Sequence, residues 1–167
     1  MHSEDEHFMM QAIAQARRAL EQGELPIGAV IVLDGVVIAE AFTGEISLRR
    51  RLVHAELLAL DAADRILPLS GRRRAAKLYT TLEPCMMCLG AAITFGISAV
   101  HYALESPTDG ATALLGRKDA VPYATFFPAP AMSGGLLRQH SIELFETYCA
   151  QRPAGPLRDW AATLACL

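Results

Sequence analysis

The spacing of apolar positions changes several times along the chain, and each change predicts a new element. Apolar residues recur three or four positions apart after Ser3, which predicts an amphipathic helix ending near Gln22. Ser3 with a glutamate three residues later has the form of a capping box, so the helix begins there. Two apolar runs, 26–33 and 36–41, flank Asp34-Gly35, a dipeptide favoured in tight hairpin turns. The chain therefore opens with a helix and an antiparallel hairpin.

Helical and strand-like patterns alternate through the rest of the chain. The stretch 42–53 has no clear period and predicts a loop, and the proline- and glycine-rich 121–135 predicts no regular structure. The remaining elements are helices over 54–67, 85–95, 136–151 and 157–166, and short strands over 77–81 and 98–104. The helix over 85–95 is almost wholly apolar, so we expect it to be buried. This order predicts an α/β fold, a three-layer α-β-α sandwich around a mixed sheet.

Composition narrows the class of protein. The 167 residues are 52% hydrophobic and 20% charged, which favours a compact fold over disorder. We expect one domain over residues 1–167, with 153–167 as a short C-terminal appendage. No apolar run reaches the roughly 18 residues that a membrane span requires, and the acidic N-terminus is unlike a signal peptide. These features predict a cytoplasmic protein that does not bind a membrane.

Charge gives little sign of a nucleic-acid partner. The formal net charge of −3 lacks the basic footprint of a dedicated nucleic-acid binder. The chain nevertheless contains two basic clusters, Arg49–Arg51 and Arg72–Arg74. Because the whole chain is acidic, we interpret both clusters as solvated loop arginines.

Two short segments carry candidate chemistry. Cys85 and Cys88 stand three residues apart at a predicted helix start, where the helix dipole favours the thiolate that binds metal. Alone, this pair is compatible with a metal site, a redox pair or two core residues. His54 and Glu56 supply an imidazole and a carboxylate at another helix start. Together the four residues predict one zinc per chain, held in an open, catalytic arrangement by His54, Cys85 and Cys88.

Such a zinc site predicts a reaction. Zinc with three protein ligands lowers the pKa of bound water to about 7, and Glu56 is placed to carry the water proton to a ring nitrogen and then to a leaving amine. This chemistry suits hydrolytic deamination of an amino-heterocycle. We expect the backbone N–H of Ala55 to face a substrate acceptor.

The H-x-E and P-C-x-x-C patterns form a known signature of zinc-dependent nucleobase deaminases. The sequence resembles the cytidine/deoxycytidylate deaminase superfamily, and its tRNA adenosine deaminase and guanine deaminase branch most, through 26–30, 54–56 and 81–88. The resemblance implies a five-stranded sheet, zinc on His54, Cys85 and Cys88, Glu56 as proton shuttle, and a homodimer. The candidate substrate contacts are Pro26, Ile27, Gly28, Ala29, Thr43, Ala55, Leu82 and Glu83.

Departures from the branch direct the substrate prediction. Relatives carry an asparagine about eleven residues before the zinc histidine, where this chain has Thr43, and they carry a basic C-terminal helix, where this chain has Glu143 and Glu146. We therefore predict a free nucleobase, nucleoside or related small heterocycle as substrate. The alternative is adenosine in a tRNA anticodon, with the two arginine clusters contacting phosphates. A third possibility, a non-catalytic zinc-stabilised binding module, leaves Glu56 without a purpose.

Overall fold

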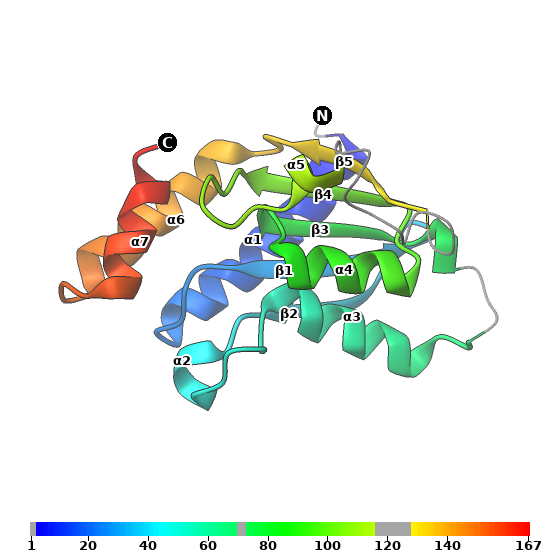
Figure 1. Cartoon of the computed structure of the whole chain (residues 1–167), viewed down its shortest axis with the longest axis horizontal. Helices are drawn as coiled ribbons and strands as arrows, with labels where there is room; N and C mark the ends of the chain where they lie inside the picture. Colours follow the sequence, from blue (N-terminus) through cyan, green and yellow to red (C-terminus); the bar gives the residue numbers. More distant parts are fainter. Residues whose placement is uncertain (1–2, 70–72, 116–127) are drawn as a thin grey trace.

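The computed structural model describes residues 3–69, 73–115 and 128–167 (Figure 1). A five-stranded sheet in the order β2-β1-β3-β4-β5 forms its centre. β1 pairs antiparallel with β2 and β3, whereas β3, β4 and β5 run parallel. The strands are β1 (Gly28–Leu33), β2 (Val36–Phe42), β3 (Lys77–Leu82), β4 (Ala99–Leu104) and β5 (Ala131–Gly134). The predicted mixed sheet is confirmed.

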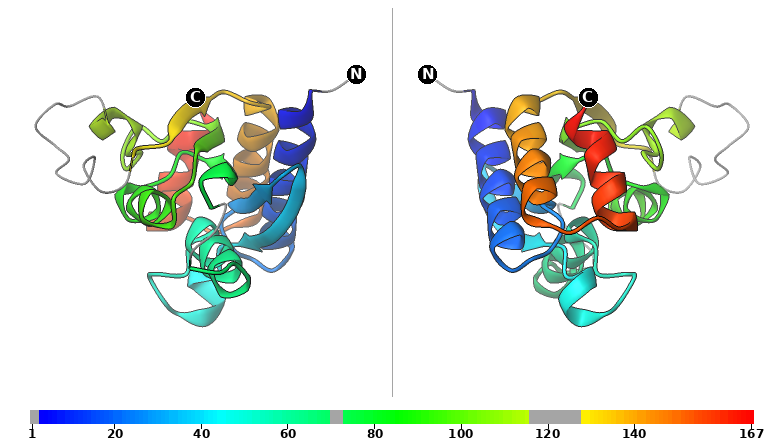
Figure 2. Two further views of the ribbon diagram at one scale, coloured as in Figure 1. Left: turned by 90° about the vertical axis from the view of Figure 1, so that its right-hand side faces the viewer. Right: turned by 90° about the vertical axis from the view of Figure 1, so that its left-hand side faces the viewer.

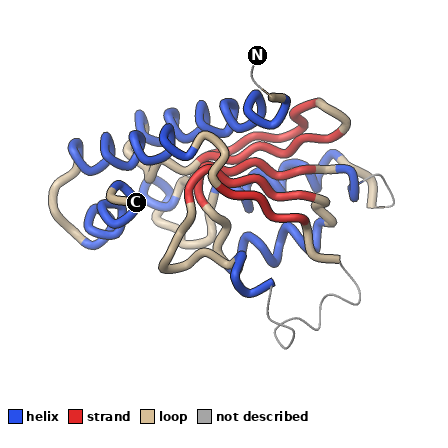
Figure 3. Tube along the Cα trace, turned by 90° about the horizontal axis from the view of Figure 1, so that it is seen from above, coloured by secondary structure: helices blue, strands red, loops and turns tan. Residues whose placement is uncertain are grey.

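Helices cover both faces of this sheet, as Figures 2 and 3 show. α3 and α4 pack on one face around Ile31, Leu78 and Val100, and α1 and α6 pack on the other around Val30 and Tyr79. The helices are α1 (Glu4–Glu21), α2 (Glu45–Leu48), α3 (Ala55–Ile66), α4 (Met86–Phe95), α5 (Thr112–Leu115), α6 (Arg138–Gln151) and α7 (Pro156–Ala165), with a 3-10 turn at Arg73–Ala75. The predicted three-layer α-β-α sandwich is therefore correct. No helix in the described part of the chain is long and apolar enough to cross a bilayer.

Local signals at the start of the chain produce the expected structure. Glu6 N–H donates to Ser3 Oγ at 3.2 Å and Ser3 N–H donates to the Glu6 carboxylate at 2.9 Å, which completes the capping box. Asp34 and Gly35 both have positive φ, 51° and 76°, as a type I′ hairpin turn requires. The first helix and hairpin are confirmed.

Four local predictions are wrong. The loop 42–53 contains the short helix α2, because the Glu24 carboxylate accepts N–H groups at its start. The helix predicted over 85–95 begins at Met86, because Cys85 is its N-cap and has extended backbone. α4 is buried on one face only, and Met86 is 69% exposed. Part of the stretch expected to lack regular structure forms β5, which is created by long-range pairing with β4; residues 121–127 of that stretch lie outside the described residues.

Candidate active site

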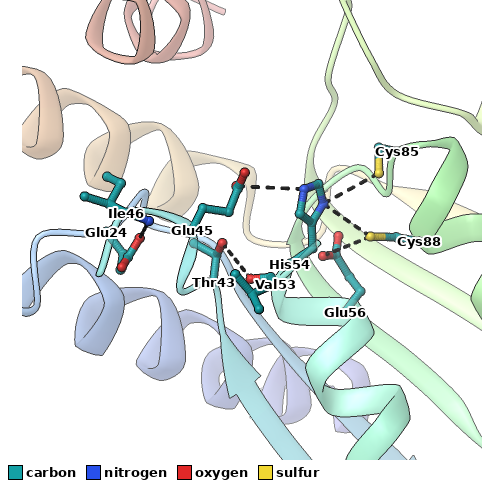
Figure 4. A network of polar contacts seen from close by, with 9 residues as sticks. All are labelled: Glu24, Thr43, Glu45, Ile46, Val53, His54, Glu56, Cys85 and Cys88. Atoms are coloured by element: carbon teal, nitrogen blue, oxygen red, sulfur yellow. Dashed lines mark hydrogen bonds and ion pairs between the residues drawn. The ribbon is translucent and has the colours of Figure 1, made fainter. Parts of the chain in front are cut away.

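Two helix starts bring the predicted zinc ligands together. His54 is the N-cap of α3, Cys85 is the N-cap of α4, and Cys88 lies in the first turn of α4. Because α3 and α4 lie side by side on one face of the sheet, their N-terminal ends meet (Figure 4). An N-cap has extended rather than helical backbone, φ −71° and ψ 149° at His54. His54 and Glu56 can therefore point toward one site although they are only two residues apart.

The donor atoms have the spacing that zinc requires. Nδ1 of His54 lies 3.6 Å from Sγ of Cys85 and 3.4 Å from Sγ of Cys88, and all three donor atoms lie within 4.8 Å of one another. Tetrahedral zinc with Zn–S of about 2.3 Å and Zn–N of about 2.0 Å places such atoms about 3.5 Å apart. An imidazole nitrogen and two thiolates are a donor set that zinc prefers. These residues fit zinc and leave a fourth position open.

Glu56 is buried beside the three donor atoms. It is 4% exposed, and its carboxylate lies 3.6 Å from Cys88 Sγ and accepts a hydrogen bond from Thr80 Oγ1 at 3.3 Å. Burial raises the pKa of Glu56, because removal of water disfavours the carboxylate. We call His54, Glu56, Cys85 and Cys88 the cavity floor.

Charges within the floor affect each other strongly. The hydrogen bond between His54 and Cys85 raises the pKa of His54 to about 9. The hydrogen bond with Cys88, and then that with His54, lower the pKa of Cys85 to about 4. Thiolate is the form in which cysteine binds metal. On the other side of the imidazole, His54 Nε2 lies 3.8 Å from the Glu45 carboxylate, and such partners orient metal-binding histidines.

A cavity of about 180 Å³ opens above the floor. Five of the eight candidate substrate contacts line it: Ile27, Thr43, Ala55, Leu82 and Glu83. Pro26, Gly28 and Ala29 do not line it. Gly28 instead lies against α1, where a Cβ atom would meet the Ala12 carbonyl oxygen at 2.3 Å. Ala29 is in the core.

Two of these candidates also hold backbone in place. Oγ1 of Thr43 and the N–H of Gly44 both donate to the Val53 carbonyl, at 3.1 and 3.0 Å, which closes the segment before His54. The Glu83 carboxylate accepts N–H groups of Ser106 and Thr112 at 2.9 and 3.0 Å. Thr43 and Glu83 therefore shape the cavity through the segments they bind.

Sequence reasoning missed part of the cavity wall. Glu45 comes from the start of α2, Asp109 from the segment after β4, and Leu157 and Trp160 from α7. We call these four residues, with Thr43, the rim. None of the four stands in a recognisable motif. The one sequence feature that pointed to this wall was Trp160, the single tryptophan of the chain.

A second hollow, of about 750 Å³, adjoins the cavity and shares Leu25, Glu45 and Leu157 with it. Five arginines line this arginine groove: Arg49, Arg50, Arg51, Arg152 and Arg158. Arg73 has a different role, because it pairs with Asp64 and donates to the carbonyls of Leu67 and Pro68 beyond α3. Arg49, Arg50 and Arg51 are exposed loop arginines as predicted, whereas Arg73 is paired rather than free in solvent, and Arg72 lies outside the described residues.

Comparison with known proteins identifies the family. Residues 2–104, which contain the whole cavity floor, match the family model described as the cytidine and deoxycytidylate deaminase zinc-binding region. The chain belongs to this family. It is accordingly a zinc-dependent hydrolytic deaminase, an enzyme that acts on C–N bonds, and the non-catalytic alternative is excluded.

Relatives within the family narrow the comparison. The chain is 38% identical over 153 residues to the tRNA-specific adenosine deaminase of Agrobacterium fabrum, covering 90% of this chain and 97% of the relative. It is 40% identical over 113 residues to the tRNA-specific adenosine deaminase of Bacillus subtilis, covering 68% and 70%. A solved structure from studies of A-to-I editing by tRNA:A34 deaminases superposes with a TM-score of 0.70 at 34% identity, covering 83% of this chain and 98% of that one.

These findings overturn the predicted substrate. All three similar proteins are described as tRNA deaminases, so the prediction of a free nucleobase or nucleoside is wrong and its tRNA alternative agrees better with the relatives. The error has a physical cause. Net charge averages over the whole surface, whereas the fold gathers arginines from two distant segments around one groove.

Proposed function

We propose that this protein deaminates adenosine to inosine at the wobble position of a tRNA anticodon. The observation that carries the proposal is the 38% identity to a tRNA-specific adenosine deaminase across 90% of the chain. The arginine groove beside the cavity supports it, because guanidinium groups bind phosphates in bidentate fashion.

The cavity is small and lies beside the arginine groove. At about 180 Å³ it is smaller than the roughly 300–1,000 Å³ of typical ligand pockets. Deaminases of nucleic acids take the target base out of its stack into such a pocket. The base would enter the cavity, and the backbone on either side of it would follow the groove.

The chemistry of the floor fits this substrate. His54, Cys85 and Cys88 would hold the zinc ion, which would supply a water of lowered pKa, about 7, for attack at neutral pH. Glu56 accepts the proton of the attacking water and delivers it to N1 of adenine. Glu56 then transfers the second proton to the leaving amino group, so that adenosine and water yield inosine and ammonia. Ala55, the first residue of α3, offers a backbone N–H to a ring acceptor.

The test compares tRNA with its components. The zinc-loaded protein is incubated with a tRNA transcript carrying adenosine at the wobble position, with the same transcript carrying guanosine there, and with free adenosine, adenine and guanine. Inosine and ammonia are measured by mass spectrometry and an enzymatic assay. We expect turnover of the first RNA only. Faster turnover of a free base would contradict the proposal.

Salt dependence gives a second, independent readout. Binding to phosphates releases counterions, so three bound phosphates of a single strand should reduce apparent affinity about 20-fold between 50 and 200 mM salt. A rate at low RNA concentration that does not change over this range would argue against phosphate recognition.

We also propose, from length and composition, that residues 1–167 form one domain and that the protein works in the cytoplasm. From the resemblance to the family we propose that it is a homodimer. Light scattering after size-exclusion chromatography measures the assembly, and a mass of one chain would contradict the dimer.

A further inference from the structure

α7 forms a wall of the cavity that no part of the zinc motif predicts. It packs on α6 through Ala161 and Leu164, both fully buried. From this helix Leu157 and Trp160 line the cavity, although they lie about a hundred residues beyond the start of the cavity floor in sequence. Figures 1 and 2 show α7 beside α6 at the end of the molecule toward which β4 points.

Trp160 is fixed on two sides. Its ring lies edge-to-face against Phe145 of α6, with centroids 6.2 Å apart and an interplanar angle of 83°. Its indole N–H donates to Oγ1 of Thr108 at 3.1 Å. Thr108 precedes Asp109 of the rim, so this bond joins α7 to the segment after β4. A flat ring is thereby held at one orientation in the cavity wall.

The rest of the wall is suited to an aromatic ring. Leu25, Ile27, Leu82 and Leu157 line the cavity with apolar side chains. Among the described residues that line the cavity, Trp160 is the only phenylalanine, tyrosine or tryptophan. Aromatic side chains bind nucleobases by stacking, because every base has a π face.

We propose that Trp160 is a substrate-binding residue on which the target base stacks, and that its bond to Thr108 holds this wall in place. The proposal deepens the function proposed above and rests on it. Trp160 takes no part in proton transfer. Its effect is on how tightly the base is held and on how well C6 is aligned over the cavity floor.

Trp160 provides its own readout, because it is the only tryptophan of the chain. Zinc-loaded Glu56→Ala protein, which should bind without turnover, is titrated with an anticodon stem-loop that carries adenosine at the wobble position. A second stem-loop, identical except for an abasic site there, serves as the control. We expect both to bind in an anisotropy assay, and only the adenosine stem-loop to change the tryptophan fluorescence markedly.

Variants separate stacking from packing. Trp160→Leu keeps an apolar side chain without a π face and should lower kcat/KM about 10- to 100-fold, mainly through KM. Trp160→Phe keeps a ring but loses the bond to Thr108, and Thr108→Val removes the same bond, so both should lower kcat/KM by only a few-fold. Phe145→Leu disturbs the packing of α7 on α6 and leaves the stacking face intact. Zinc content and thermal denaturation verify that each variant is folded.

The outcomes distinguish the two proposals. If neither stem-loop binds and no RNA is deaminated, the proposed function fails. If adenosine RNA is bound and deaminated but the fluorescence does not respond to the base, or Phe145→Leu raises KM as much as Trp160→Leu does, the stacking role fails while the function stands.

Discussion

The cavity floor comes from two short segments, 54–56 and 85–88, whereas the rim comes from segments spread between Thr43 and Trp160. The floor is positioned by two adjacent helix starts, so local sequence determines most of its geometry. The rim exists only after the whole chain has folded. This difference explains why the reaction is readable from a motif and the substrate is not.

The rim has its own supports, which are two carboxylates that bind backbone. Glu24, 1% exposed, accepts the N–H groups of Ile46 and Ser47 at 2.9 and 2.6 Å and so fixes α2. Glu83 does the same for the segment that carries Thr108 and Asp109. The backbone groups that these two carboxylates bind lie outside the cavity floor. Changes to floor and rim should therefore have separable effects.

The largest effect is expected from removal of a zinc ligand. Cys85→Ala should reduce zinc from about one per chain to roughly a tenth or less and abolish activity, because two remaining protein ligands hold zinc weakly. Metal analysis and the deaminase assay measure both effects. The matched control is Cys149→Ala, whose thiol lies on α6. A normal zinc content in Cys85→Ala would show that Cys85 is not a zinc ligand.

Removal of the proton carrier should separate chemistry from metal binding. Glu56→Ala should keep zinc and lower kcat about 10²- to 10⁴-fold, the usual contribution of general acid–base catalysis. Single-turnover kinetics on tRNA give the value. Retained activity together with normal zinc content would show that another group carries the proton.

The arginine groove should affect binding without affecting the chemical step. Arg50→Ala combined with Arg51→Ala should raise KM for tRNA. The slope of the logarithm of affinity against the logarithm of salt concentration should become shallower by about 0.7 for each phosphate that is no longer bound. Arg17→Ala with Arg18→Ala is the control of equal charge, because neither residue lines the groove. Equal losses in the two double variants would indicate a general charge effect.

Glu24 tests whether the rim depends on its support. Glu24→Gln weakens the acceptor for two N–H groups and should destabilise the protein by about 1–3 kcal/mol, with a higher KM and an almost unchanged kcat. Urea denaturation and steady-state kinetics measure these quantities. Glu21→Gln, an exposed neighbour, is the control. A fall in kcat as large as the rise in KM would mean that floor and rim are coupled.

The smallest effect is expected far from both regions. Tyr79 donates a hydrogen bond to Asp5 and lowers the pKa of that carboxyl, assisted by His101 and Lys77. Because the pKa is lower in the folded state, this stability is present above pH about 4 and is lost as the pH falls through the folded pKa. Asp5→Asn should therefore weaken the fall in stability on the acid side, measured by denaturation at pH 7 and pH 3.5, without changing zinc content or KM.

Prediction from sequence succeeded where the physical cause is local. The capping box at Ser3, the turn at Asp34-Gly35 and the helix starts at His54 and Cys85 depend on a few neighbouring residues. β5 failed because its cause is parallel pairing with β4, which no short window contains. α2 failed because Glu24 supplies its support from about twenty residues upstream.

The candidate site divides along the same line. The chemistry of the floor follows from residue types at helix starts, so it could be predicted from the sequence. Glu45, Asp109 and Trp160 meet only through tertiary packing. The arginine groove combines residues near 50 with residues beyond 150, and a net charge cannot represent such a distribution.

The two hydrogen bonds to the Val53 carbonyl affect which sequence changes this enzyme can tolerate. Thr43 and Gly44 both donate a hydrogen bond to the Val53 carbonyl. The segment from Gly44 to Val53 is therefore a loop whose two ends are held together. Doubling the length of such a loop costs only about 0.6 kcal/mol in closure entropy. Beyond α2, whose Glu45 contacts His54, the segment can therefore be lengthened while its two ends stay in place. Sequence changes in this segment can therefore alter the rim without altering the three zinc ligands.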